Sequence, residues 1–305
     1  MYRLIIDNID IMYNSNNIQW NTDTDTLGTQ LSFDTIKDLY EGQVVSLFCN
    51  DRELIRGIVV KKTWNRWTFS YIVQDYSLYL KNKIPFKQFN RMKASDCISS
   101  LLGEAYMTGS IVNIPTIITE MYRGKTRADI IDDILEKAQN DQGIEYFKEI
   151  ECTTVYIRQL QEMKITSAIE ISKDVNIESS IENLKNKISV ISNSNDDNSI
   201  YASAEDTTYQ YWYGVLEDVE EVDADNIANA QNIANNKLNE LNKIERSTSI
   251  EIVCLDDGAD IKANRLIYLN AGSRLCGFYK IKSASHTLNK GVHKVSLEIE
   301  WKVAA

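Results

Sequence analysis

The stretch VVSLFC at residues 44–49, the turn NDR at residues 50–52 and the returning stretch at residues 54–62 decide the fold class. Apolar and β-branched residues dominate both stretches, and Asn-Asp-Arg is turn chemistry. A second turn at residues 65–66 leads into WTFSYIV at residues 67–73. Three strands joined by tight turns form an antiparallel meander, which is typical of a small barrel or half-barrel.

A second segment near the C-terminus repeats this pattern. Residues 41–62 and 263–282 each contain a strand, a polar turn, an Arg-containing return and a glycine (Gly57 and Gly277). Each segment then continues as an alternating strand that carries lysine. A glycine inside a strand marks a bulge or a close backbone approach, which we expect at Gly57. Any two hairpins can look this similar, so chance likeness and two copies of one small barrel are both open.

The middle of the chain mixes helices and strands. Ser95-Asp96 predicts the start of a short helix over residues 97–102 that ends at Gly103. Thr126 and Asp129 form a capping box for a second helix that ends at Gly143. Its apolar face carries Ile130, Ile131, Ile134, Leu135 and Ala138. Strands are expected at residues 144–147 and 153–160, so the segment reads as an α+β module.

The remainder of the chain predicts further strands and one long helix. A hairpin is expected between residues 187–191 and 200–203, with the polar residues 192–199 at its tip. Residues 223–246 predict a surface helix, with acidic residues at its start and basic residues at its end, as the helix dipole favours. Its narrow apolar stripe is Ile227, Ala230, Ala234, Leu238 and Leu241. The last strands are expected at residues 249–255, 265–270, 275–283 and 294–303.

The predicted fold class is therefore α+β and mostly β. Residues 1–82 form a first β-barrel domain, and residues 83–165 form the inserted α+β module. Residues 166–305 form a second β-barrel domain that includes the helix at residues 223–246.

Composition excludes some classes of function. The 305 residues carry 33 Lys and Arg against 44 Asp and Glu, a net charge of −11. Such a charge disfavours nucleic-acid and anionic-membrane binding, because phosphate contacts need cations. No stretch has the apolar length of a membrane span, and residues 1–7 alternate like a strand rather than a secretion signal. We expect synthesis and folding in the cytoplasm, or export without a cleaved signal.

Few residues suggest chemistry. His286 and His293, with Asp256, Asp257 and Asp260 upstream, suggest either a zinc site or a hydrogen-bonded pair at a hairpin. The spacing matches no helical zinc motif, which favours the pair. Adjacent carboxylates could serve a glycosidase only if they faced each other across a cleft, and chance pairs are expected among so many acids. These pairs are Asp132-Asp133, Asp196-Asp197, Glu220-Glu221 and Asp256-Asp257.

Other motifs point away from enzymatic chemistry. The five cysteines form no CxxC pair and are expected to be buried small side chains in a reducing compartment; they are Cys49, Cys97, Cys152, Cys254 and Cys276. Phosphate-binding glycine loops and the GxSxG motif are absent. The tryptophans are expected to anchor a core or an interface; they are Trp20, Trp64, Trp67, Trp212 and Trp301. The sequence predicts no catalytic, cofactor-binding or metal-binding residue, and no cofactor.

The C-terminal stretches GFYKIKSASH at residues 277–286 and GVHKVSLEI at residues 291–299 resemble a known family. They are similar to the baseplate hub proteins of contractile phage tails and phage-tail-like particles, of the late-control-D type found in Gram-positive phages and prophages. Residues 74–82, 180–190 and 213–217 extend the resemblance, which spans roughly residues 40–303.

This resemblance implies a non-enzymatic structural protein of a virion or tail-like bacteriocin (tailocin, R-type bacteriocin), assembled in the bacterial cytoplasm. It implies a homotrimer of two-barrel subunits that forms a pseudo-sixfold ring around an axial channel. Such a ring adapts a hexameric tail tube to a trimeric central spike. The implied partners are the tail tube protein, the central spike protein, baseplate wedge proteins and the tape-measure protein, with no specific nucleic acid and no membrane. The chain ends after the last strand, so the spike is expected to be a separate protein.

A different class of function is a peptidoglycan hydrolase associated with the tail tip. That alternative requires His286 or His293 to meet an acid or a metal in a cleft.

Overall fold

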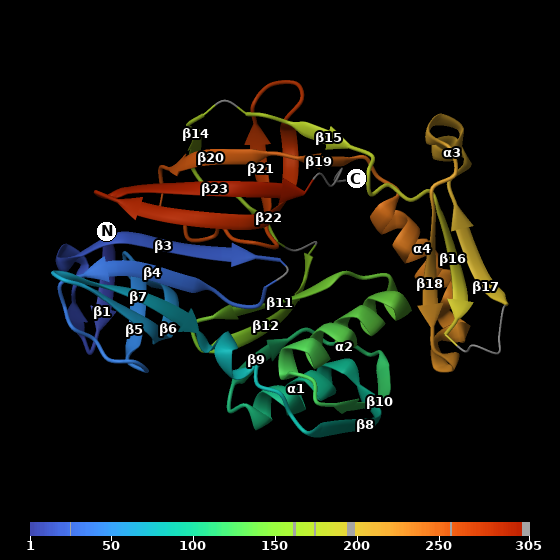
Figure 1. Cartoon of the computed structure of the whole chain (residues 1–305), viewed down its shortest axis with the longest axis horizontal. Helices are drawn as coiled ribbons and strands as arrows, with labels where there is room; N and C mark the ends of the chain where they lie inside the picture. The colour runs from blue at the N-terminus through green and yellow to red at the C-terminus, as the bar shows by residue number, and fades with distance from the viewer. Residues whose placement is uncertain (25, 161–162, 174, 194–198, 257, 301–305) are drawn as a thin grey trace. The chain divides into compact units, whose positions relative to one another are not determined.

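The computed structural model describes residues 1–300 except 25, 161–162, 174, 194–198 and 257 (Figure 1). The protein is mostly β, with few helices. The first strands are β1 (Tyr2–Ile6), β2 (Ile9–Asp10), β3 (Ser15–Asp23), β4 (Gln30–Thr35), β5 (Val44–Cys49), β6 (Arg52–Asn65), β7 (Thr68–Asp75), β8 (Phe86–Lys93), β9 (Thr108–Ile111), β10 (Ile117–Arg123), β11 (Tyr146–Glu151) and β12 (Thr154–Gln159). The later strands are β13 (Lys164–Ile165), β14 (Ile169–Ile171), β15 (Glu178–Ser180), β16 (Lys187–Ser192), β17 (Ile200–Glu205), β18 (Glu217–Val222), β19 (Glu245–Ser247), β20 (Ser249–Cys254), β21 (Leu266–Asn270), β22 (Cys276–Asn289) and β23 (Val292–Glu300).

The α-helices are α1 (Ala94–Glu104), α2 (Arg127–Gln142), α3 (Thr207–Tyr213) and α4 (Ala230–Leu241). Short 3₁₀ turns are η1 (Met12–Asn14), η2 (Tyr76–Tyr79) and η4 (Ala224–Asn229). None of the described helices is long and apolar enough to cross a membrane.

The chain forms two compact units. The first contains Met1–Ile134, Tyr146–Ile177 and the chain from Thr248 onward. The second contains Leu135–Glu145 and Glu178–Ser247.

One large sheet dominates the first unit. Its strands follow the order β14-β20-β23-β22-β3-β4-β7-β6-β5-β1-β2, with β21 beside β22 and β13 beside β21 (Figure 1). All pairs are antiparallel except β13 with β21. The sheet is continuous because β3, from the start of the chain, pairs with β22, from its end.

This sheet contains the same strand order twice. The early half runs β3-β4-β7-β6-β5, and the late half runs β14-β20-β23-β22-β21. Val44 pairs with Ile58 in the early hairpin, and Leu266 pairs with Lys280 in the late one, so equivalent residues lie 222 positions apart (266 − 44 = 222). The predicted likeness of the two hairpins is therefore confirmed at the level of register.

Fine details of the two hairpins also match. Each long strand has a register shift against the strand that follows it, at Val59/Lys61 in β6 and at Ile281/Ser283 in β22. Val59 donates to the carbonyl of Gln43 at 3.0 Å, and Ile281 donates to the carbonyl of Arg265 at 2.8 Å. Gly42, which precedes Gln43, and Asn264, which precedes Arg265, both have left-handed backbone, with φ of 86° and 62°. Gly and Asn tolerate this conformation, which explains both residue types.

The glycine alignment expected from sequence is wrong. Gly277 is equivalent to Ile55, not to Gly57, because the turn after β21 is longer than the turn after β5. Gly57 nevertheless marks a close backbone approach as predicted, since a Cβ there would collide with the carbonyl oxygen of Gln74. The equivalent residue in β22 is Tyr279.

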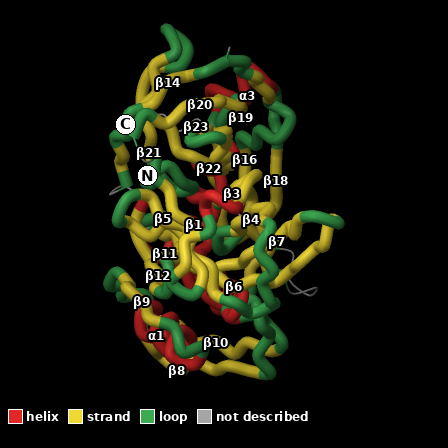
Figure 2. The backbone as a smooth tube through the Cα atoms, turned by 90° about the vertical axis from the view of Figure 1, so that its left-hand side faces the viewer, coloured by secondary structure: helices red, strands yellow, loops and turns green. Residues whose placement is uncertain are grey.

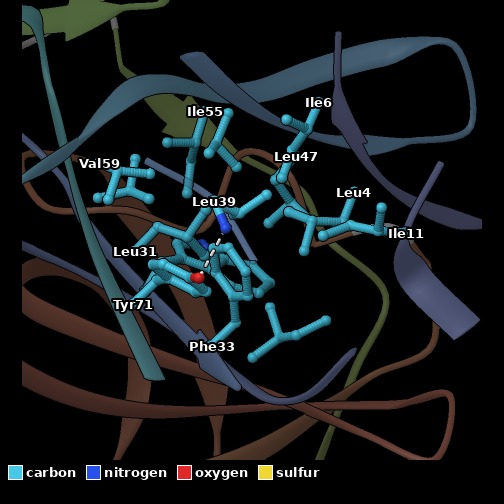
Figure 3. Close-up of a cluster of buried hydrophobic side chains, with 14 of the residues drawn as sticks. Leu4, Ile6, Ile11, Leu31, Phe33, Leu39, Leu47, Ile55, Val59 and Tyr71 are labelled. Carbon is cyan, nitrogen blue, oxygen red and sulfur yellow. Dashed lines mark hydrogen bonds between the residues drawn. The ribbon is translucent and has the colours of Figure 1, made fainter. Parts of the chain in front are cut away.

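Each half of the sheet has its own hydrophobic core. The early core gathers residues of β1 and β3–β7 around Phe33 and Tyr71, whose hydroxyl accepts a hydrogen bond from the amide of Leu39 at 2.8 Å (Figure 3). The late core gathers residues of β20–β23, among them Ile252, Ile281 and Leu297.

The α+β segment lies in the first unit up to Ile134 and from Tyr146. The helix α1 contacts β8, β9 and β10, as Figure 2 shows. It begins at Ala94 and extends past Gly103, so the predicted helix bounds were too narrow. The capping box is confirmed, because the Thr126 and Asp129 side chains each accept the other's amide hydrogen bond. The apolar face of α2, from Ile130 to Ala138, is buried as predicted.

In the second unit, a sheet in the order β17-β16-β18 packs one face against α4. The predicted hairpin is present as β16 and β17, while its tip at residues 194–198 lies outside the described residues. The helix predicted over residues 223–246 is shorter: α4 covers Ala230–Leu241, and Glu245–Ser247 pairs with β15 instead. The segment is rich in asparagine, whose side chain competes with helical backbone bonds and so favours the earlier end.

Candidate functional site

His286 and His293 meet on the buried side of the large sheet, where β22 pairs with β3. Nδ1 of His286 lies 2.8 Å from Nε2 of His293, and the Tyr2 hydroxyl lies 2.8 Å from Nδ1 of His293. The indole of Trp20 stacks on the His286 ring, with centroids 4.7 Å apart and planes at 10°. Both histidines are buried. The predicted hydrogen-bonded pair is confirmed, and Tyr2 and Trp20 complete a cluster that sequence did not reveal.

The environment of His286 disfavours its charged form. Burial lowers the pKa of His286 to about 3, the neighbouring His293 acts in the same direction, and the Ile261 backbone opposes them. His286 therefore helps to join strands of the two halves rather than presenting a charged base at neutral pH.

The acids suggested as zinc ligands are engaged elsewhere. Asp256 accepts hydrogen bonds from the amides of Ala168 and Gly258 at 2.7 and 2.8 Å. Asp260 forms an ion pair with Arg52 at 2.8 Å, and Asp257 lies outside the described residues. Within the described chain, no group of three or more His, Cys, Asp or Glu residues is placed to hold a metal ion. The zinc hypothesis has no support in this geometry.

A partly buried charge cluster ties β11 to the start of β21. Arg265 reaches both carboxylate oxygens of Glu149, at 2.6 and 2.9 Å, and Lys262 lies 3.3 Å from the same carboxylate. Arg158 pairs with Glu149 and Glu151. Burial acts to raise the pKa of Glu151, but Lys262 and the two arginines hold it below the usual value. This cluster fixes the α+β segment to the late half of the sheet.

Sequence reasoning missed that cluster. The spacing of Glu149 and Glu151 on one strand face was a visible signal. Two of their cationic partners, Lys262 and Arg265, however, lie more than a hundred residues away.

Several of the adjacent carboxylates that the structure describes have structural partners. Asp132 pairs with Lys148, and Asp133 accepts a hydrogen bond from the Tyr122 hydroxyl, whose pKa burial raises. Glu220 lies 3.7 Å from Lys237. Asp196 and Asp197 lie outside the described residues. These contacts give no support to a glycosidase.

The cysteine prediction is only partly correct. All five are free, and Cys49 and Cys97 are buried, but Cys152 and Cys254 are half-buried and Cys276 is exposed. Cys276 begins β22 on an outward-facing position beside Tyr268, which explains its exposure.

The tryptophans divide into one core residue and three surface residues. Trp20 is buried, whereas Trp64, Trp67 and Trp212 are 70%, 77% and 70% exposed. Trp301 lies outside the described residues. Exposed tryptophans are unusual on a monomer and often mark an interface.

The outer half of β6 has an open edge. On that side, β5 pairs with residues 52–58, and the last backbone bonds join Val59 to Gly42 and Gln43. Within the described chain, no strand continues along residues 60–65. The equivalent edge of β22 is occupied, because residues 283–288 pair with β3. At the far end of the sheet, β14 pairs only with β20 among the described strands.

Charge is distributed unevenly along the chain. Residues 178–247 contain fourteen Asp and Glu against five Lys and Arg, which is −9 of the total −11. Residues 60–70, at the β6–β7 hairpin, contain three cations and no acid. The surface thus offers an acidic region in the second unit and a basic, tryptophan-bearing hairpin in the first.

Solved structures of phage tail proteins share the fold of this chain. The prophage MuSo2 43 kDa tail protein of Shewanella oneidensis superposes with a TM-score of 0.73 at 10% identity, over 98% of this chain and 97% of that one. The tail protein of Neisseria meningitidis MC58 gives a TM-score of 0.74 at 12% identity, over 98% and 95%. The chain belongs to the YQBQ-like family, whose model matches residues 18–300.

A more distant likeness links the fold to secretion machinery. The Escherichia coli c3393 protein superposes with a TM-score of 0.55 at 9% identity, over 99% of this chain and 77% of that one. That protein is described as a type VI secretion component similar in structure to the T4 tail proteins gp27 and gp5. A comparison with curated protein sequences gives no match.

Proposed function

We propose that this protein is a structural baseplate hub of a contractile phage tail or a tail-like bacteriocin particle. In this proposal it is a homotrimer that adapts a hexameric tail tube to a trimeric central spike around an axial channel. Residues 1–82 form one barrel and residues 83–165 the α+β module. Residues 166–305 form the second barrel, with the acidic segment inserted between β14 and β20. The fold shared with the tail proteins from Shewanella oneidensis and Neisseria meningitidis supports a tail role.

The single observation that carries the proposal is the contrast between equivalent edges in the two halves. Residue 286 of β22 is equivalent to residue 64 of β6, because the register offset is 222. His286 is covered by Trp20 of β3, whereas Trp64 is exposed. In the late half, this edge of β22 pairs with β3 of the same chain. In the early half, the equivalent edge of β6 is available to a strand from another molecule.

A second copy of the chain can occupy this edge in an equivalent way. The strand equivalent to β3 is β14, and its outer side has no partner among the described strands. A contact between β6 of one copy and β14 of the next is heterologous, so repetition closes a ring if the rotation fits. Three copies with two halves each give six similar positions. A ring of this symmetry matches a hexameric tube on one face and a trimeric spike on the other.

The charge fits a channel through which a negatively charged cargo passes. A trimer carries about −33 (3 × −11), and an acidic wall does not retain DNA or an acidic tape-measure protein. The proposed partners are the tail tube protein, the central spike protein, the baseplate wedge proteins and the tape-measure protein. The proposal involves no enzymatic step.

Blocking the open edge tests the proposal. In a two-residue hairpin the paired residues alternate, so the amides of Lys62 and Trp64 face away from β7. Lys62→Pro removes one of these outward donors without removing a bond to β7. We expect the wild-type protein to be a trimer by light scattering and Lys62→Pro to be largely monomeric at the same micromolar concentration.

Lys62→Gln is the matched control, because it also loses the ion pair with Asp38 but keeps the backbone amide. It should remain trimeric. A wild-type monomer that fails to bind tail tube protein would overturn the proposal. Peptidoglycan clearing in zymography that is lost in His293→Ala would replace it with the hydrolase alternative.

A further inference from the structure

The short helix α3 in the second unit displays two large aromatic side chains to solvent. Tyr211 and Trp212 are 81% and 70% exposed, and their rings meet edge-on at 5.2 Å. On the other side of the helix, Tyr209 and Tyr213 are half-buried and contact each other at 5.6 Å. Val215, just after the helix, is also exposed. Exposed aromatic groups of this size have a hydration cost that a partner would relieve.

The chain holds this helix in one position through a buried asparagine. Asn186 is fully buried; its side-chain nitrogen donates to the carbonyl of Gly214 at 2.7 Å, and its side-chain oxygen accepts from the amide of Leu216 at 2.8 Å. Its backbone carbonyl accepts from the amide of Asp206 at 2.9 Å. Asn186, which directly precedes β16, therefore holds the chain at both the start and the end of α3.

A cap completes the support. The Asp206 carboxylate accepts from the amides of Thr208 and Tyr209 at 2.9 and 3.1 Å, and from the side chain of Asn242 at 2.7 Å. Since the helix is braced at both ends, Tyr211 and Trp212 are presented with little backbone entropy left to lose. Preorganisation of this kind favours binding.

The surroundings of α3 are acidic. In the sheet, Lys187 of β16 lies opposite Glu205 of β17 on one side and opposite Glu217 of β18 on the other. The end of β17 and the start of β18 therefore lie beside the start of β16, and α3 connects them. Asp206 and Asp218 follow in the chain at the same end, and the cation Lys187 forms an ion pair with Glu217 at 3.0 Å. Hydrogen bonds from Lys187 and Ser189 lower the pKa of Glu217, and hydrogen bonds from Asn242 and nearby amides lower the pKa of Asp206.

We propose that Tyr211 and Trp212, with Glu205, Glu217 and Asp218 around them, form a docking surface for a partner protein that presents an apolar side chain flanked by Lys or Arg. Charge complementarity selects this occupant, because residues 178–247 carry −9. Aromatic faces also attract guanidinium groups. A nucleic acid or the same region of a second copy would bring like charges together. The surface needs no trimer contact, so it stands or falls independently of the proposed ring.

The first test uses defined probes on the full chain. One fluorescent peptide alternates Arg and Leu over twelve residues, and its partner alternates Glu and Leu. We expect the Arg peptide to bind and the Glu peptide not to bind. The double variant Tyr211→Ser/Trp212→Ser should bind the Arg peptide at least tenfold more weakly. Tyr106→Ser removes an aromatic ring that is 98% exposed in the first unit and should change the affinity less than twofold. Equal binding by the double variant would overturn the proposal.

The second test identifies the occupant. A photoreactive benzoylphenylalanine replaces Trp212 in the full chain, expressed in its own bacterial host, and another chain carries it at Tyr106. We expect a cross-link from position 212 to a Lys- or Arg-rich segment of a different protein. A cross-link to a second copy, to nucleic acid, or to nothing would overturn the proposal. Light scattering on the double variant separates the two ideas, because the trimer should persist when the docking surface is lost.

Discussion

The outer halves of β6 and β22 are equivalent by register, yet one is exposed and the other is buried. His286 of β22 contacts both Trp20 and His293, and its strand pairs with β3. Trp64 of β6 occupies the same register position with no covering strand among the described residues. The two halves of a duplicated sheet can thus differ in which edge is buried, depending on the neighbouring strand, while the strand order stays the same.

The residue types follow the cover. On β22, the neighbouring strand belongs to the same chain and is always present, so the site can hold two buried histidines that hydrogen-bond to each other. On β6, the large aromatic side chain of Trp64 is stable in solvent, and a strand from another molecule would bury its apolar area. The following predictions test this contrast, beginning with the largest expected effect.

Trp20→Ala should destabilise the protein by about 4 kcal/mol, because a buried Trp loses its packing and leaves a cavity. Trp20 contacts both histidines and Tyr2, so its loss also opens the junction between the halves. Denaturant unfolding measures the change. Trp67→Ala, at the exposed hairpin tip, is the control and should leave the midpoint nearly unchanged. Equal midpoints for both variants would contradict the assigned role of the junction.

Arg265→Ala should cost about 3 kcal/mol, near the lower end of the range for breaking a buried ion pair. Lys262 and Arg158 still accompany Glu149, which keeps the loss moderate. The equivalent residue in the early half is Gln43, which donates to Asp7 at 2.6 Å in a neutral-to-charged hydrogen bond. Gln43→Ala should therefore cost about 1.5 kcal/mol, the lower end for a hydrogen bond to a charged group. The same unfolding assay compares the two, and a larger loss at Gln43 would reverse the ranking.

Stability should fall as the pH drops from 6.5 toward 3. Burial holds the pKa of His286 at about 3 in the folded state, against 6.5 for the free group. Between these values the unfolded chain binds a proton that the folded chain does not, so acid favours unfolding. The slope for one such group is about 1.4 kcal/mol per pH unit, or about 2 kcal/mol between pH 6.5 and 5.

The comparison is made between pH 6.5 and 5, above the ordinary pKa of a free carboxyl group. The Lys173, Lys294 and Ser172 side chains lower the pKa of Glu251 to about 2, so its contribution to the acid response lies at lower pH. His286→Phe keeps a planar ring without a titrating group. It should flatten the slope even if it lowers the overall stability. An unchanged slope in that variant would mean that another group controls the acid response.

Local features of the sequence predicted the hairpins well. Contacts between residues far apart in the chain could not be predicted from it. Val44–Cys49 is the strand that the turn chemistry predicted, because a tight turn fixes its neighbours. The register of the late hairpin could not be read from its glycine, since loop length shifted the alignment. The contact between Trp20 and His286 joins residues at opposite ends of the chain. No local pattern encodes such a pairing, so the junction and its aromatic cover emerged only from the structure.

Trp64→Ala should have the smallest effect on folding, within about 0.5 kcal/mol, because surface substitutions lose little packing. Its side chain is 70% exposed and lies opposite Phe69 at the hairpin end. The same variant should weaken self-association by tenfold or more if a second copy covers this edge, since an exposed aromatic group becomes an interface anchor on assembly. Unfolding of the monomer and sedimentation of the trimer must therefore respond differently to one substitution. If Trp64→Ala leaves the association constant unchanged, no second copy covers the edge of β6. The contrast with β22 then means that β6 has no neighbouring strand on that side, rather than one supplied by another copy.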